Sequence, residues 1–166
     1  GESATTFTTL NDGTAITYQE LIDFNGYINV HLSATELSTL VAQGDIGQNE
    51  LTGETISYDL NERDVAGING TVEFAKRVNQ TTLVSIYLTG TPAGGSHSAH
   101  IHENDIATTG IIIVVLTPVS GDSGIINTQL STLVRGAELH YTLLLTIHHT
   151  VYVILYFPFL DIFFPK

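Results

Sequence analysis

The sequence contains no cysteine, no methionine and no tryptophan, and only five of its 166 residues are lysine or arginine. Without cysteine the chain has no disulfide framework, no zinc finger and no thiol nucleophile. Because methionine is absent, residue 1 is not a translated start, and we expect that a secretory signal has been removed. A removed signal would place the protein outside the cell, secreted, at the cell surface or in a matrix.

Basic residues are outnumbered by 17 acidic ones, so the formal net charge is −12. A chain of this charge repels the phosphates of nucleic acids and anionic membrane surfaces, so we expect neither as a partner. It attracts divalent metal ions instead. Hydrophobic residues make up 43% of the chain and charged residues 13%, a composition that buries a core and is too apolar for disorder.

Short segments rich in β-branched and aromatic residues recur along the chain, bounded by Gly, Asn or Asp. They lie at residues 15–18, 26–33, 54–60, 70–78, 81–90, 98–104 and 110–119. In the segment 70–78, Val72 and Phe74 are expected to face inward, and "VNQTTL" is expected to form a hairpin connection. This spacing predicts an all-β fold, an antiparallel Greek-key-type β-sandwich.

One or two short helices are also predicted. Residues 17–24 begin with Thr and have helical apolar spacing. In the segment 33–45, Ser33 is a candidate N-cap, Glu36 completes a capping box and Gly44 would end the helix.

The chain repeats part of itself at an offset of 123 residues, where "TTLNDGTAITYQEL" (8–21) aligns with "STLVRGAELHYTLL" (131–144). Identical pairs include Tyr18 with Tyr141 and Val30 with Val153, whereas His31 aligns with Ile154. Such self-similarity indicates copies of one structural unit. We therefore divide the chain into three parts. Residues 1–50 are the tail of one such unit and a candidate donor to another subunit, and residues 51–133 are the body of the next unit. Residues 134–166 are a degenerate repeat with an apolar C-terminal strand.

The segment 143–166 is far more apolar than the rest of the chain. Its length would suffice for a membrane span, but His148, His149, Pro158 and Asp161 interrupt it. It is also typical of a strand that becomes buried in a neighbour's sheet. A third reading is that this part of the sequence is in error.

Three of the seven histidines lie within "GGSHSAHIHEND" (94–105). On a strand, His100 and His102 would project from one face about 6.5–7 Å apart, with Ile101 in the core. His31, in another alternating segment, is the candidate third metal ligand, and His97, on the preceding glycine turn, a fourth ligand or supporting group. Imidazole ligands suit copper or zinc, and the many acidic residues make calcium a further alternative. Hydrogen-bonded surface histidines are the non-metal interpretation.

The segments Ala99–His102, Ile28–His31 and Gly44–Gln48 together resemble the CHRD domain, a module named from chordin and widespread in secreted bacterial proteins. The resemblance covers most of residues 26–120, although the elements occur in permuted order, as the repeat requires. The His-Ile-His strand is also similar to the copper-binding strand of Cu/Zn superoxide dismutases. These resemblances imply a superoxide dismutase-like sandwich with His31, His100 and His102 as copper ligands.

We therefore expect a secreted structural subunit of an extracellular fibre or matrix, which joins copies of itself by strand exchange and binds copper through these histidines. One alternative is a copper-dependent superoxide dismutase-like oxidoreductase, but a surface of this charge would repel the superoxide anion. Another alternative is a secreted adhesion or binding module. A non-enzymatic role is favoured.

Overall fold

The structure is a computed structural model that describes residues 1–131, 141 and 149–154. These residues form two compact units. The N-terminal unit comprises Gly1–Thr52 together with Arg77–Asn79, and the sandwich unit comprises Gly53–Lys76 and the described residues from Gln80 onward.

The N-terminal unit contains the helix α1 (Tyr18–Ile22) and an antiparallel pair of strands, β1 (Asn25–His31) and β2 (Leu40–Gly47). Thr17 caps the helix: its hydroxyl accepts from the Glu20 amide, and the Glu20 carboxylate accepts from the Thr17 amide at 2.8 Å. The hydrogen bonds from Thr17 also hold the pKa of Glu20 below its usual value. The helix predicted for residues 17–24 is therefore confirmed.

Two other predictions for this unit are wrong. Residues 33–39 form turns rather than a helix, and β2 then pairs with β1 from Leu40 opposite His31 to Gly47 opposite Asn25. The ladder with β1 overrides the local capping pattern of Ser33 and Glu36, because helix propensity is a weak constraint. The strand predicted at 15–18 is reduced to an isolated bridge between Ala15 and Thr9.

Arg77 holds the segment 77–79 in the N-terminal unit. Its guanidinium is buried, lies 3.0 Å from the Asp45 carboxylate and donates to the Asn49 carbonyl at 2.5 Å. The amide of Val78 donates to Glu50, and the side-chain amide of Asn79 donates to Asn49. A buried cation needs such partners, because burying it unpaired is costly.

The strands β1 and β2 do not enclose a core. Gly26 is the one buried residue of the two strands. A sheet of two strands is only marginally stable by itself in water. Exposed large apolar residues of this unit are Phe7, Leu10, Tyr18, Ile22, Phe24, Tyr27, Ile28, Val30, Leu32, Leu37, Leu40, Val41, Leu51 and Val78.

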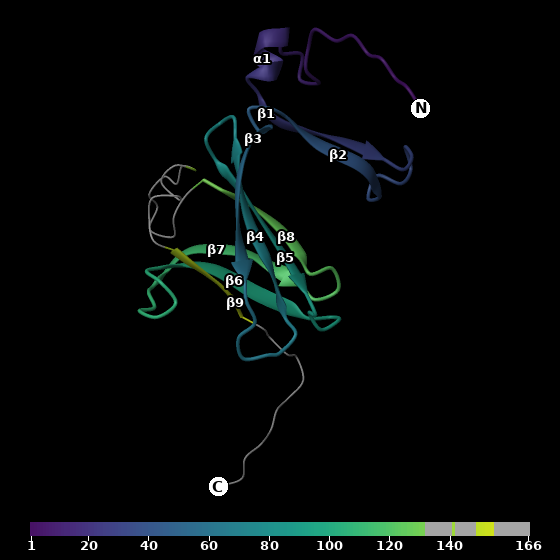
Figure 1. The fold of residues 1–166 in the computed structure, drawn as a ribbon. Coiled ribbons are helices and arrows are strands. Elements are labelled where there is room, and N and C mark those ends of the chain that lie inside the picture. The colour runs from purple at the N-terminus through teal and green to yellow at the C-terminus, as the bar shows by residue number, and fades with distance from the viewer. Residues whose placement is uncertain (132–140, 142–148, 155–166) are drawn as a thin grey trace. The chain divides into compact units, whose positions relative to one another are not determined.

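The sandwich unit has two antiparallel sheets (Figure 1). One has the strand order β3-β4-β5-β8, with β3 (Leu51–Leu60), β4 (Asn69–Arg77), β5 (Thr82–Thr89) and β8 (Ile125–Leu130). The other has the order β7-β6-β9, with β7 (Ile112–Ser120), β6 (Ser96–Glu103) and β9 (His149–Ile154). The chain leaves β5 for the β6–β7 pair and returns with β8 beside β5, a Greek-key-type return.

The two sheets bury a common core, which confirms the predicted all-β sandwich. In β4, Val72 and Phe74 face inward as expected, and β6 contributes Ala99 and Ile101, which are fully buried. The core residues are Val72, Phe74, Val84, Ile86, Leu88, Ala99, Ile101, Ile113, Val114, Leu116, Val119, Ile126, Leu130 and Tyr141. The hairpin predicted at "VNQTTL" joins β4 to β5, with Gln80 at a φ of 67°.

Strand β9 lies within the apolar segment 143–166, so this part of the segment is a strand. It pairs with β6 of its own chain. The remaining residues of the segment lie outside the described residues. Within the described ranges, no helix is long and apolar enough to cross a membrane.

The burial of the core side chains predicts how much the loss of one of them destabilises the protein. Ile86 is fully buried in β5, so Ile86→Ala should lower the free energy of unfolding by roughly 2–5 kcal/mol through lost burial and the cavity left behind. Chemical denaturation measures this change. Ile125→Ala, at an exposed residue of β8, is the matched control and should change stability by about 0.5 kcal/mol or less. Equal effects of the two changes would contradict this assignment of the core.

Candidate metal centre

His100 and His102 lie side by side on β6, as predicted. Both are half-buried, on the face of the strand opposite the fully buried Ala99 and Ile101. Their ring centroids are 6.1 Å apart and the rings are inclined at 70°. Two imidazoles that share one metal ion at about 2.0–2.1 Å from nitrogen have centroids about 4.5–5.2 Å apart at angles of about 90–110°, and about 6.4 Å apart when they bind from opposite sides. The observed spacing lies between these limits and therefore allows a shared ion at a wide angle.

A backbone carbonyl orients the His102 ring. Nδ1 of His102 lies 2.8 Å from the Gly110 carbonyl oxygen. Since a carbonyl only accepts, Nδ1 carries the proton and the lone pair is on Nε2. A metal-binding histidine commonly has this arrangement, in which a second group fixes its tautomer and orientation.

The loop between β6 and β7 positions that carbonyl. The Asp105 carboxylate accepts from the amides of Ala107 and Thr108, and the Glu103 amide donates to the Ile111 carbonyl at 3.0 Å. A Cβ at Gly110 would lie 2.2 Å from the Glu103 carbonyl oxygen, so the close approach requires glycine. Sequence reasoning missed Gly110, because no side-chain pattern marks a backbone acceptor.

His100 offers a different environment from His102. Its Nδ1 is buried, and no hydrogen-bond partner for it occurs among the described residues. Across the ladder His100 lies opposite Val115 of β7 and Tyr152 of β9, and His102 lies opposite Ile112. Val115 and Ile112 are exposed, so the histidine pair lies on an outer face beside apolar side chains.

His97, the proposed fourth ligand, lies on the other face of β6. The strand begins at Ser96, so the two-residue period already applies at His97 and turns it inward with Ala99 and Ile101. Its side chain is 0% exposed, and neither ring nitrogen has a hydrogen-bond partner in the described part of the chain. A Cβ on Gly95 would lie 2.6 Å from its ring. The structure therefore does not bring His97 together with His100 and His102.

His31, the proposed third ligand, is the last residue of β1 in the N-terminal unit. Its Nδ1 and the Asn29 Oδ1 are buried without a hydrogen-bond partner among the residues described. Strand alternation places the two side chains on one face. His31 belongs to one unit and His100 and His102 to the other, so its membership of the site stays a prediction.

Within residues 1–131, 141 and 149–154, no group of three or more histidine and acidic residues is close enough to hold a metal ion. His140 and His148 lie outside the described residues. The backbone of His149 lies opposite Glu103 in the ladder between β6 and β9. The described residues therefore bring two imidazoles together, and a metal ion bound there would need further ligands.

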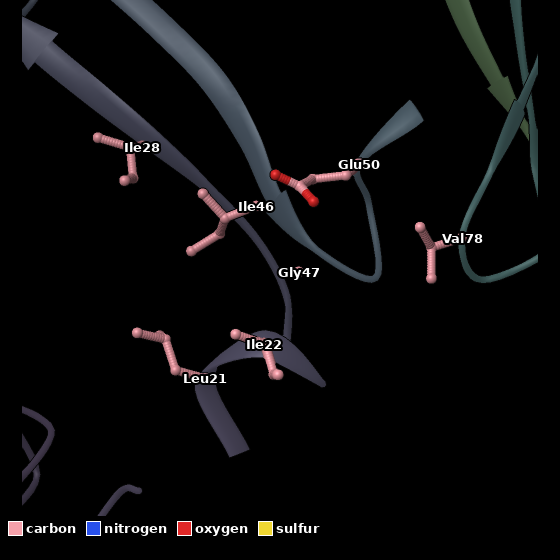
Figure 2. Close-up of a pocket in the computed structure, with 7 residues that line it drawn as sticks. All are labelled: Leu21, Ile22, Ile28, Ile46, Gly47, Glu50 and Val78. Carbon is pink, nitrogen blue, oxygen red and sulfur yellow. The ribbon is translucent and has the colours of Figure 1, made fainter. Parts of the chain in front are cut away.

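The N-terminal unit carries an apolar pocket of about 380 Å³ (Figure 2). It lies between α1 and the β1–β2 pair and contains one acidic group. Its lining residues are Leu21, Ile22, Ile28, Ile46, Gly47, Glu50 and Val78. A pocket lined by aliphatic side chains and one carboxylate is better suited to bind apolar groups than a polar substrate.

Comparisons of the chain with protein-family models, with curated protein sequences and with solved structures give no match.

The buried environment of His97 makes the second prediction. A polar ring in the core without hydrogen bonds is destabilising, so His97→Leu should raise the free energy of unfolding by about 1 kcal/mol. Thermal or chemical denaturation at neutral pH measures the change. His100→Leu, on the outer face of the same strand, is the control and should not stabilise the protein. A destabilised His97→Leu variant would contradict the inward, unbonded position of the ring.

Proposed function

We propose that this protein is a secreted structural subunit of an extracellular fibre or matrix, which assembles with copies of itself through its N-terminal unit. The observation that carries the proposal is the exposure of apolar side chains on β1 and β2. A sheet of two strands without a core is a poor folding unit, and exposed sheet edges are sites of association. The sandwich unit, by contrast, has a complete core of its own.

The kind of surface exposed supports assembly rather than catalysis. Ile28 and Val30 alternate with Asn29 and His31 along β1, which is the pattern of a strand with one face in a core and one face outside. In the single chain both isoleucine and valine are exposed. Burial of each would contribute about 1.5–3 kcal/mol. A second copy of the sandwich offers the core that these side chains lack.

We further propose that the assembled protein binds a metal ion at His100 and His102, with His31 as the third ligand. The donor set suits copper first and zinc second, since both favour imidazole nitrogen. Calcium fits less well, because it prefers oxygen ligands. The ring spacing and the anchoring of His102 by Gly110 support this site. The ion would cross-link strands, which is a structural role.

The charge of the chain sets the conditions for assembly. Each copy carries −12, so copies repel one another at low ionic strength. Salt screens this repulsion over a Debye length of about 8 Å at physiological ionic strength. Bound divalent ions reduce it further.

Assembly makes the third prediction. The variant Ile28→Ser with Val30→Ser should weaken self-association by roughly 3 kcal/mol or more, a factor of over a hundred in the association constant. Sedimentation and electron microscopy at physiological salt should show high-mass assemblies for the unchanged protein and monomers for the variant.

The matched control is Val115→Ser with Ile106→Ser, which removes apolar groups exposed on the sandwich unit and should leave assembly intact. If the unchanged protein remains dispersed as monomers at high concentration and physiological salt, the proposed function is wrong.

Metal binding makes the fourth prediction. His100→Ala and His102→Ala should each weaken Cu²⁺ binding by more than about tenfold, measured by calorimetry and by metal analysis of protein purified without chelators. His97→Leu is the control, because His97 lies on the opposite face of β6, and it should retain binding. If the unchanged protein and the three variants bind Cu²⁺ equally, the proposed site is wrong.

A further inference from the structure

The strand β1 is the counterpart of the strand β9 in the repeated sequence. At the offset of 123 residues, β1 (Asn25–His31) falls on residues 148–154, and β9 is His149–Ile154. The helix α1 begins at Tyr18, and its counterpart Tyr141 also has a helical backbone. The two copies therefore agree in backbone conformation at these described positions, the tyrosine pair and the strands β1 and β9.

The two copies differ in what surrounds them. Tyr141 is 2% exposed in the sandwich core, whereas Tyr18 is 78% exposed. Leu130 is 3% exposed and its counterpart Phe7 is 51% exposed. Val151 packs against the core, whereas its counterpart Ile28 is 55% exposed. The N-terminal copy thus has the apolar residues of a core-forming segment without the core.

We propose that β1 of one copy takes the place of β9 beside β6 in a second copy, with Tyr18 of the donor at the position that Tyr141 occupies in the acceptor. This proposal rests on the proposed self-assembly and specifies its partner and register. The occupant of the acceptor site is the N-terminal unit of another copy of this chain.

The register follows from the ladder between β6 and β9. In that ladder Ala99 lies opposite Val153 and Ile101 opposite Val151. The exchanged strand would therefore place Val30 opposite Ala99 and Ile28 opposite Ile101. Ala99 and Ile101 are fully buried, and residues directly opposite in an antiparallel pair share a face. Both exposed aliphatic side chains of β1 would enter the core.

The same register carries His31 to the histidine pair. Ser98 lies opposite Ile154, so His31 would lie opposite Ser98, on the outer face that also carries His100. It is then the diagonal neighbour of His100, at a distance that long side chains bridge. The donor would thereby supply a third imidazole to the pair formed by His100 and His102.

The exchange also protects a sheet edge. Among the described strands, β9 lies at one edge of the sheet β7-β6-β9. Strand β1 arrives already paired with β2, so the exchanged sheet would have the order β7-β6-β1-β2. The edge beyond the incoming strand would be occupied, which stabilises the sheet beyond what β9 provides.

Tyr18 would enter the site of Tyr141 at the same time. Tyr141 donates its amide to the Gln80 carbonyl, and its ring lies 5.8 Å from the Lys76 ammonium. Because β9 and Tyr141 occupy the acceptor site within their own chain, exchange requires their displacement. Displacement by another chain is bimolecular, so it is favoured as the protein concentration rises.

A reversible lock on β9 tests the proposal. Ser98→Cys with Ile154→Cys joins two opposed positions of the ladder, whose expected Cα separation allows a disulfide. The chain has no other cysteine, so the pairing is unambiguous. In the oxidised, locked variant we expect loss of high-mass assemblies by sedimentation and electron microscopy, and in the reduced variant we expect their return. The control is Ser98→Cys alone, kept reduced, which should assemble.

A second measurement tests the register between chains. His31→Cys in one preparation and Ser98→Cys in another, of different mass, should form a mixed disulfide when assembled together and oxidised. Val30→Cys, which the register turns to the core face, should cross-link to Ser98→Cys at least several-fold less.

The outcomes separate the two proposals. If the locked protein assembles as well as the reduced protein, strand exchange at β6 is wrong while self-assembly stands. If the mixed disulfide forms equally from His31→Cys and Val30→Cys, the register is wrong. If the unchanged protein never assembles, the proposed function fails, and the exchange fails with it.

Discussion

Strand β6 is hydrogen-bonded on both edges, to β7 and to β9, and the sandwich depends on this double pairing. Because the strand is held in a fixed register, its two-residue period divides its side chains cleanly between two environments. His97, Ala99 and Ile101 complete the core, and His100 and His102 face outward. A shift of one residue would bury His100 and His102 and expose the core, so the same pairing determines both stability and the candidate site.

Much of this arrangement could be predicted from the two-residue period of the sequence. That period places Val72 and Phe74 inward and pairs His100 with His102. It failed for His97, because the extent of β6 was underestimated by two residues and the glycine turn was taken to include it. The helix predicted at 33–45 failed because Ser33 and Glu36 report only the preference of one turn, whereas β2 pairs with the preceding strand β1, from Leu40 opposite His31 to Gly47 opposite Asn25.

Other features could not be read from residue types at all. The Gly110 carbonyl that orients His102 is a backbone group, and only the folded loop, closed by Asp105, brings it within 2.8 Å. The position of β9 beside β6 follows from tertiary pairing between residues about 50 apart in the chain. The repeat nevertheless indicated that a strand would form near the C-terminus, because it aligned β1 with the residues that form β9.

The repeat gives a physical reason why assembly and metal binding should be coupled. In the C-terminal copy of the repeat, Tyr141 and Val151 pack in the sandwich core. In the N-terminal copy, their counterparts Tyr18 and Ile28 are exposed to water. The hydrophobic effect therefore draws the N-terminal copy towards an equivalent core. Where the copies differ, at Ile154 and His31, the N-terminal one carries an imidazole instead of an aliphatic side chain. The proposed exchange places that imidazole beside His100, and an ion held there would stabilise the junction between copies.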